Sequence, residues 1–311
     1  MSYEQVAFGS GGVECSGWLF RATGEHLASD AGRPIAVMAH GLAGTKDSGL
    51  ESFATALAEA GIDVLAFDYR GFGTSEGTPR QVVSVSGQLA DYQAAMRAAA
   101  QLPDVDPDRL VLWGESLSGG TVLAAAAGRR DVAAVISMVP VVNGLATGRH
   151  VMTSLPLSAM ARSSAQGLAG QLATMAGRPP ALMPVVGKPG QPAAMSLPGN
   201  YEDYLSIAGP SWRNEIGVTI ASEMMTFRPV KYASKLGRPW LVQIADFDRS
   251  APPHSAAKAA FRGRAEVRHY PCDHFDTQVG KDWHELAVAH QVAFLRRHLT
   301  PKPATVDSTG I

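Results

Sequence analysis

The segment VLWGESLSGG, residues 111–120, constrains the fold more than any other part of the chain. An apolar run predicts the end of a strand, Gly114 begins a sharp turn that carries Ser116, and two glycines lead into the small-residue run TVLAAAAG, which favours a helix. Such a strand, turn and helix can lift a nucleophilic hydroxyl clear of the backbone, and small residues allow the close approach. The usual pattern is G-x-S-x-G, whereas Ser118 occupies its last position here. Taken alone, the segment is equally compatible with a plain loop.

The composition of the 311-residue chain is ordinary for a globular protein with a sizeable core, because 46% of its residues are apolar and 18% are charged. The net charge of −1 provides no electrostatic attraction for nucleic acid or an anionic membrane surface. We find no signal-peptide pattern and no apolar run long enough to span a bilayer. The two cysteines indicate neither a disulfide framework nor a multi-cysteine zinc site. We therefore expect a cytoplasmic protein with no membrane span and no nucleic-acid partner.

Apolar runs alternate with helical patterns, which predicts βαβ units and a largely parallel sheet. The expected strands are Val13–Phe20, Pro34–Ala39, Asp63–Tyr69, Leu110–Gly114, Val132–Val139, Trp240–Ala245 and Ala265–Tyr270. The expected helices are Ser48–Ala60, Val83–Leu102, Leu117–Arg129, Ser255–Phe261 and Trp283–His298. Within the helix that begins at Val83, we expect Val85, Leu89, Tyr92 and Met96 to face the sheet, because they recur at a spacing of three to four residues.

The alternation stops in residues 144–227, where prolines and glycines interrupt the pattern. Seven of the 11 methionines lie in this segment: Met152, Met160, Met175, Met183, Met195, Met224 and Met225. An insertion rich in flexible apolar side chains is typical of a cap over a pocket, although these methionines could instead form a small core of their own. We therefore predict a core formed by residues 1–143 and 228–299, a cap at 144–227 and a flexible tail at 300–311.

A serine hydroxyl becomes a good nucleophile only when a base takes its proton and an acid orients that base. Asp246 and Asp248 follow the expected strand PWLVQIA, and His274 follows the expected strand AEVRHYP. Both groups therefore come after Ser116 and at strand ends. The order nucleophile, acid, histidine is the order used with this kind of turn.

Four parts of the sequence together resemble the α/β-hydrolase superfamily: MAHGLAGTKD, FDYRGFGTSEG, LWGESLSGG, and the pair ADFDRSAP and YPCDHFD. The resemblance extends from about residue 9 to residue 299. More narrowly, the chain is similar to bacterial hydrolases of the serine aminopeptidase and X-Pro dipeptidyl-peptidase type. It implies an α/β-hydrolase fold with a mostly parallel eight-stranded sheet, flanking helices and an inserted cap.

The resemblance also implies roles for individual residues. Ser116 matches the nucleophile, His274 the general base and Asp248 the acid that orients the base, with Asp246 as its structural competitor. The two aspartates beside the histidine, at positions 273 and 276, are too close in sequence to orient the ring and are expected to serve the turn.

Acyl transfer also needs donors for the developing oxyanion, and we expect them to be the backbone N–H groups of Leu42 and Leu117. The side chains of these leucines can then line an apolar pocket. The alternative for the first loop is a glycine-rich turn with no ligand. We expect Arg70 to pair with a carboxylate. A metal site at His269, Cys272 and His274 lacks suitable ligand spacing, so neither a metal nor a cofactor is expected.

The favoured function is a serine hydrolase that cleaves a carboxylic ester or thioester through an acyl-enzyme, with an apolar acyl or alkyl group. A serine peptidase or aminopeptidase is an alternative, for which charged groups must hold a free terminus of the peptide. The predicted cap offers four such groups: Glu202, Asp203, Glu215 and Glu223. An acyltransferase of natural-product assembly is another, and a non-enzymatic binding module a third. The expected partner is a small-molecule ester, thioester or amide. The sequence leaves a homodimer open.

Overall fold

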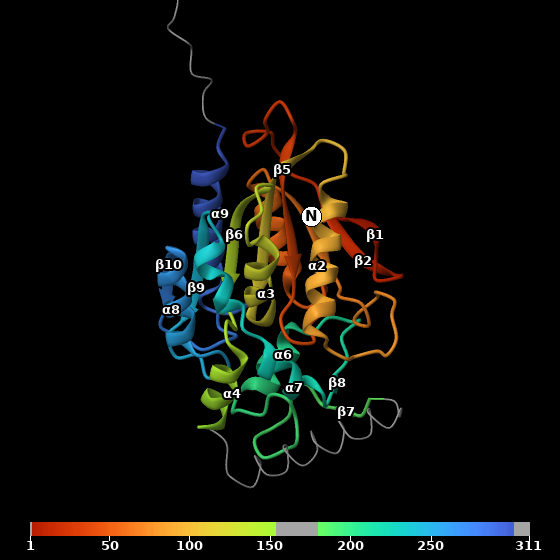
Figure 1. Ribbon diagram of the computed structural model, residues 1–311, viewed down its shortest axis with the longest axis vertical. Helices are drawn as coiled ribbons and strands as arrows, with labels where there is room; N and C mark the ends of the chain where they lie inside the picture. The colour runs from red at the N-terminus through yellow and green to blue at the C-terminus, as the bar shows by residue number, and fades with distance from the viewer. Residues whose placement is uncertain (1, 154–179, 302–311) are drawn as a thin grey trace, which may run out of the picture.

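A single mixed sheet lies at the centre of the computed structural model, which describes residues 2–153 and 180–301 (Figure 1). Its strands follow the order β1 (Glu4–Ser10), β2 (Val13–Phe20), β4 (Asp63–Phe67), β3 (Arg33–Ala39), β5 (Val105–Glu115), β6 (Val132–Met138), β9 (Trp240–Ala245) and β10 (Glu266–Tyr270). Strand β2 is antiparallel to both neighbours, and every other adjacent pair is parallel. The predicted mostly parallel, eight-stranded sheet is therefore confirmed, and β1 is a strand that the sequence analysis missed.

Helices cover both faces of the sheet. One face is covered by α2 (Val85–Ala99), α3 (Ser116–Ala126), α8 (Pro253–Gly263) and the 3₁₀ helix η1 (Pro229–Lys235), and the other by α1 (Leu50–Glu59) and α9 (His284–Leu299). Each face of the sheet has its own hydrophobic core. Successive residues of β3 alternate between the two, with Val37 in the core under α2 and α3 and Met38 in the core under α1 and α9. A parallel strand buried on both faces needs such a nearly continuous apolar run.

The buried side of α2 is the predicted one, but it also carries a charged residue that was not predicted. Tyr92 and Met96 are fully buried as expected, and Val85 and Leu89 are half-buried and pack against the same core. Asp91 is buried in the same helix, where its carboxylate pairs with Arg70 (Nε to Oδ1, 2.7 Å). The expected pairing of Arg70 with a carboxylate is confirmed. An analysis of apolar spacing cannot find such a buried carboxylate.

The strand order reverses at the centre of the sheet. After β3 the chain adds β4 on one side of it and β5 on the other, and the last residues of β3 and β5 are neighbours, with Ala39 opposite Gly114. The loops that leave two such strands diverge to opposite faces and open a crevice at their carboxyl ends, where ligands of open α/β sheets bind. The reversal therefore brings the loop after β3 beside Ser116.

Residues 144–227 leave the sheet after β6. Their described elements are α4 (Gly144–Met152), β7 (Leu182–Met183), α6 (Asn200–Ile207), β8 (Ile216–Gly217) and α7 (Ile220–Thr226). These elements lie together beyond one end of the sheet, at the bottom of the view in Figure 1. Met160 and Met175 lie outside the described residues, as do residues 302–311 of the predicted tail. The division into a core and a cap stays a prediction.

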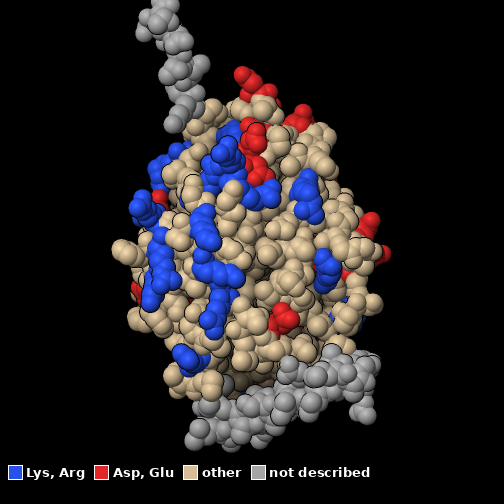
Figure 2. Space-filling model, viewed as in Figure 1, with Lys and Arg blue, Asp and Glu red and all other residues tan. Residues whose placement is uncertain are grey.

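Charged side chains are unevenly spread over the surface. Figure 2 shows Lys and Arg gathered in a band on the side of the molecule where α8 lies in Figure 1, with few acidic groups among them. The net charge of −1 therefore conceals a local separation of charge on this face. Within the described residues, no helix combines the length and the hydropathy needed to cross a membrane.

Candidate active site

Ser116 lies on a strained turn between β5 and α3. Its φ is +51°, a left-handed value that a residue other than glycine adopts only when its surroundings enforce it. The turn is possible because Gly114 has no side chain. A Cβ atom at this position would lie only 2.3 Å from the carbonyl oxygen of Ser118. This geometry is the strand–turn–helix arrangement that the sequence pattern predicts.

The side chains of Ser116, His274 and Asp248 form a continuous hydrogen-bonded chain. The Ser116 Oγ atom is 3.1 Å from Nε2 of His274, and Nδ1 of His274 is 2.6 Å from Oδ2 of Asp248. The three residues are only 8%, 4% and 3% exposed, in that order. The structure thus brings together the three residues that the sequence analysis selected from strand ends far apart in the chain.

The surroundings of Asp248 fix the orientation of the imidazole. Its other oxygen, Oδ1, accepts the backbone N–H groups of Ser250 (2.8 Å) and Ala251 (2.6 Å). A carboxylate held in this way accepts the Nδ1 proton of His274, which leaves Nε2 free to accept a proton from Ser116. Burial lowers the pKa of His274, but the charge and hydrogen bond of Asp248 outweigh burial and raise this pKa above its usual value.

The competing acid, Asp246, lies elsewhere. Its Oδ1 atom is 2.6 Å from Nδ1 of His269, in an exposed pair on the protein surface. His269 and His274 therefore contact different carboxylates. Burial raises the pKa of the Cys272 thiol to about 12, so the thiol between these histidines in sequence stays protonated.

The two aspartates that flank His274 in sequence serve the turn. Asp273 accepts the backbone N–H groups of Arg249 (3.0 Å) and His274 (2.8 Å) and forms an ion pair with the Arg249 guanidinium. Burial raises the pKa of Asp273, but these hydrogen bonds and the ion pair lower it further than burial raises it. Asp276 accepts the N–H of Asp273. Together these contacts fix the backbone from which His274 projects.

The loop after β3 lies directly beside the serine. A Cβ atom at Gly41 would be 2.9 Å from the Cβ atom of Ser116, so glycine is required at this contact. The N–H of Leu42 donates to no acceptor in the part of the chain that the structure describes. Leu117 is in the first turn of α3, where backbone N–H groups lack partners within the helix. Both predicted oxyanion donors thus lie close to Ser116, and their role stays a prediction.

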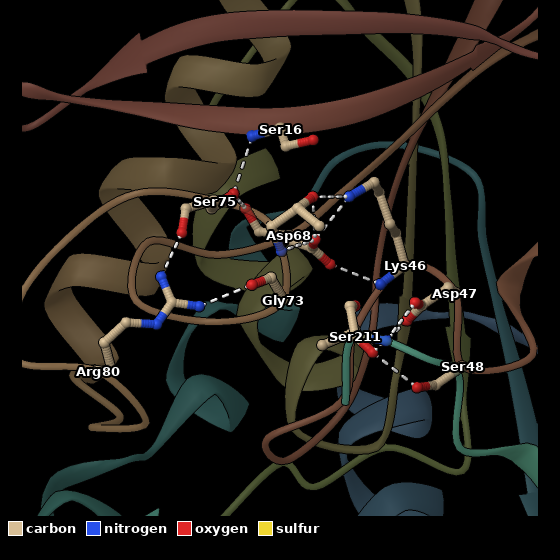
Figure 3. A network of polar contacts seen from close by, with 11 residues as sticks. Ser16, Lys46, Asp47, Ser48, Asp68, Gly73, Ser75, Arg80 and Ser211 are labelled. Carbon is tan, nitrogen blue, oxygen red and sulfur yellow. Dashed lines mark hydrogen bonds and ion pairs between the residues drawn. The ribbon is translucent and has the colours of Figure 1, made fainter. Parts of the chain in front are cut away.

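A buried ion pair joins this loop to the loop after β4 (Figure 3). Asp68 accepts the backbone N–H of Lys46 at Oδ1 and its ammonium group at Oδ2, both at 2.6 Å. The Ser75 hydroxyl donates to the Asp68 carbonyl (2.7 Å) and accepts the N–H of Ser16 in β2 (2.8 Å). The Asp68 carboxylate and the Lys46 ammonium group thus compensate each other's charge, which a buried pair requires if it is not to destabilise the fold.

Three further hydrogen bonds connect the same loop to residues 144–227. Asp47 accepts the N–H of Ser211 (2.8 Å), and the Ser48 hydroxyl accepts the N–H of Gly209 (3.2 Å). The hydroxyl of Tyr204 in α6 donates to the carbonyl of Leu42 (2.7 Å). The insertion therefore contacts the backbone that carries a predicted oxyanion donor.

A cavity of 460 Å³ opens beside Ser116 and His274. All five described methionines of the insertion line it: Met152, Met183, Met195, Met224 and Met225. No Asp or Glu is among its lining residues in the described ranges 2–153 and 180–301. Two of the acidic residues considered for a peptidase have other partners, since Glu223 accepts the N–H of Val85 and Asp203 pairs with Lys281. The other two, Glu202 and Glu215, are exposed.

Several residues of the site were missed by the sequence analysis. Glu115 is buried, with Oε1 3.7 Å from Nδ1 of His40 and with Oε2 unpartnered among the described residues. Its position directly before Ser116 was a visible signal, as was Ser118 in place of the usual glycine. Tyr69 and Tyr204 gave no local signal, because their contacts depend on how distant segments meet.

Comparisons with known proteins agree with this geometry. A family model described as serine aminopeptidase, S33, matches residues 31–177. The quorum-quenching protein AidA of Acinetobacter baumannii is 35% identical over 297 residues, which cover 94% of each chain. The polyketide transferase af380 of Aspergillus fumigatus is 28% identical over 311 residues, covering 96% of this chain and 99% of the other. The crystal structure of the α/β hydrolase GrgF from Penicillium sp. sh18 superposes with a TM-score of 0.75 at 23% identity, covering 96% of this chain and 99% of the other.

The match to AidA extends over nearly the whole of both chains, and the sheet order, the strained serine turn and the solved structure lead to the same assignment. The predicted α/β-hydrolase fold is confirmed. The chain belongs to the α/β-hydrolase superfamily, and its residues 31–177 are similar to the family described as serine aminopeptidase, S33.

Proposed function

We propose that this protein is a serine hydrolase that cleaves a carboxylic ester or thioester through an acyl-enzyme. One observation carries the proposal: the hydrogen-bonded chain Asp248–His274–Ser116 ends at an apolar cavity large enough for a small-molecule acyl group. The mechanism needs a nucleophile, a base, an oriented acid and two oxyanion donors, and all five groups lie within this part of the molecule.

In the proposed reaction, the Ser116 Oγ atom attacks the carbonyl carbon while Nε2 of His274 takes the hydroxyl proton. Asp248 stabilises the imidazolium that forms, and the N–H groups of Leu42 and Leu117 donate to the tetrahedral oxyanion. The C–O or C–S bond then breaks, and His274 returns the proton to the departing alcohol or thiol. Water, activated by the same imidazole, attacks the acyl-enzyme and releases the acid and the free serine.

The cavity lining supports an apolar acyl or alkyl group, because thioether and aliphatic side chains supply most of its wall. The lack of a carboxylate among its described lining residues disfavours an aminopeptidase, which must hold a positively charged amino terminus. We propose that residues 144–227 act as the cap that supplies this wall.

Acyl transfer is the second candidate, because a relative that covers nearly the whole chain is named a polyketide transferase. Transfer uses the same acyl-enzyme, and an alcohol or amine replaces water in the second step. The name of the quorum-quenching relative specifies no reaction, so this relative is compatible with both hydrolysis and transfer.

The direct test is the turnover of p-nitrophenyl esters from acetyl to dodecanoyl by the wild type and by Ser116→Ala. We expect turnover by the wild type with an optimum at one chain length, and a loss in kcat on the order of 10⁴-fold or more in the variant. Ser206→Ala, which changes a serine on the exposed side of α6, is the matched control and should retain wild-type rates. Turnover that survives in Ser116→Ala would exclude the serine mechanism.

Product analysis in the presence of an alcohol separates the two candidates. Free acid as the main product indicates hydrolysis, whereas a new ester indicates transfer. Both outcomes require the acyl-enzyme, which mass spectrometry detects as an acyl adduct on the peptide that contains Ser116.

A further inference from the structure

Ser118 departs from the usual G-x-S-x-G pattern, and its hydroxyl group is in contact with the loop after β3. The residue is 1% exposed in the first turn of α3. Its Oγ atom is 2.5 Å from the carbonyl oxygen of His40 and 2.7 Å from the hydroxyl of Tyr69. A glycine at this position could make neither contact.

The chemistry of the three groups fixes the direction of these hydrogen bonds. A carbonyl oxygen only accepts, so Ser118 donates its single proton to His40. The Tyr69 hydroxyl must then donate to the Ser118 Oγ atom. Burial raises the pKa of Tyr69 above its usual value, so this donor keeps its proton throughout the pH range in which His274 titrates.

These contacts hold the backbone on both sides of the Leu42 N–H. The His40 carbonyl accepts from Ser118, and the N–H of Gly41 donates to Nδ1 of the His40 ring (2.8 Å). On the other side, the Leu42 carbonyl accepts from Tyr204 (2.7 Å). The N–H of Leu42 itself is left without an acceptor in the described residues and so remains free for a ligand.

We propose that Ser118 is a positioning residue that holds the Leu42 N–H toward the oxyanion formed at Ser116, with Tyr69 as the donor that orients Ser118. The inference rests on the proposed function, because an oxyanion forms only if Ser116 attacks a carbonyl group. Gly41 lies between the held His40 carbonyl and the Leu42 N–H, and a Cβ atom there would be 2.9 Å from the Cβ atom of Ser116. The conformation of the two peptide groups that flank Gly41 therefore sets where the Leu42 N–H points relative to Ser116. Preorganised donors are effective because they need not reorient when charge develops.

The test begins with Ser118→Ala on the best p-nitrophenyl ester. We expect kcat to fall by about 10- to 100-fold with KM changed less than about threefold, because a displaced donor loses part of the effect of a removed one. An alkyl boronic acid, which forms a tetrahedral adduct on Ser116, should bind the variant more weakly by a similar factor. Equal losses in ester binding and kcat would contradict a role confined to the oxyanion.

Tyr69→Phe tests whether Tyr69 acts through the hydrogen bond from Ser118 to His40. It should lower kcat less than Ser118→Ala does, because Ser118 can still donate to His40. The double variant Ser118→Ala/Tyr69→Phe should have the kcat of Ser118→Ala alone, since Tyr69 acts through Ser118. Additive losses of kcat in the double variant would show that Tyr69 does not act through Ser118.

Ser137→Ala is the matched structural control. Ser137 is fully buried in β6, and its hydroxyl donates to the carbonyl of Gly119 (2.7 Å) in the same helix α3 while it accepts from Trp240. Its loss should lower stability to a similar extent as the loss of the Ser118 hydroxyl, but it should leave kcat near the wild-type value. If both variants lose the same kcat, Ser118 has only a structural role.

Hydrogen exchange separates a failure of this inference from a failure of the proposed function. Backbone exchange in residues 40–44 should become faster in Ser118→Ala and stay unchanged in Ser137→Ala, whatever the substrate is. If the wild type turns over no ester or thioester, the proposed function fails, and unchanged exchange in Ser118→Ala overturns the positioning role by itself.

Discussion

The two sides of the cavity are built from different interactions. On the side of the sheet, short hydrogen bonds and a buried ion pair fix the backbone, as in the contacts Ser118–His40 and Lys46–Asp68. On the side of the insertion, methionine side chains form much of the wall, and their contacts have no preferred direction. A negative charge that develops in a reaction is stabilised only by hydrogen-bond donors that point at it. An apolar chain, in contrast, needs only a cavity of suitable shape and volume. The side of the sheet is therefore suited to the proposed reaction, and the side of the insertion to binding the proposed acyl group.

Among the changes that test this comparison, the largest effect should follow from one on the side of the sheet. Asp248→Asn removes the charge that stabilises the His274 imidazolium and disturbs its tautomer. We expect kcat to fall by about 10³- to 10⁴-fold with little change in KM. Steady-state kinetics with the preferred ester measures the loss. A change in KM alone would instead assign Asp248 to substrate binding. The proposed division between a reactive side and a binding side of the cavity would then fail.

The pH profile examines the same pair without a mutation. His274 must be neutral to accept the serine proton, and its pKa is raised above the usual value near 6.5. The kcat/KM of the wild type should therefore be low in acid and rise with pH through an inflection above 6.5. In Asp248→Asn the inflection should move to lower pH, because the imidazolium has lost its carboxylate partner. An unchanged inflection would mean that another group controls the profile.

An intermediate effect is expected for the buried ion pair. Lys46→Met leaves the Asp68 carboxylate without its cation in a buried site, so the free energy of unfolding should fall by about 3 to 5 kcal/mol. Chemical denaturation measures this change. Lys281→Met breaks the more exposed pair with Asp203 and should lower the same quantity by no more than about 1 kcal/mol. Similar losses in both variants would show that burial does not decide the strength of these pairs.

The smallest effect should come from the side of the insertion. Met195→Ala enlarges the cavity at a half-buried position and should shift the preferred ester toward longer chains. We expect the ratio of kcat/KM for long and short esters to change by about 3- to 10-fold, the value of one or two buried methylenes. Met96→Ala in the core should lower stability without a change in this ratio. A preference that stays the same in Met195→Ala would place the acyl group elsewhere.

The same contrast explains what could be predicted from the sequence. Strands β2 and β9 have the bounds that were expected, because Gly11 and Gly12 mark the turn before β2 and Asp246 begins the turn after β9. Ser116, His274 and Asp248 could be selected because each follows such a strand. Strand β1 was missed because its residues are mostly exposed and lack a clear apolar alternation. The contact of Tyr204 with Leu42 could not be predicted, since it depends on where an insertion without regular periodicity crosses the sheet.

The methionines of the cavity also make the wall chemically vulnerable. Met152 and Met225 are 48% and 61% exposed, so a peroxide in solvent can reach them before the three that are less exposed. Oxidation to the sulfoxide replaces a soft apolar sulfur with a polar and chiral group. Oxidation of these two side chains would therefore make the wall of the cavity more polar, and reduction of the sulfoxides would restore the apolar wall.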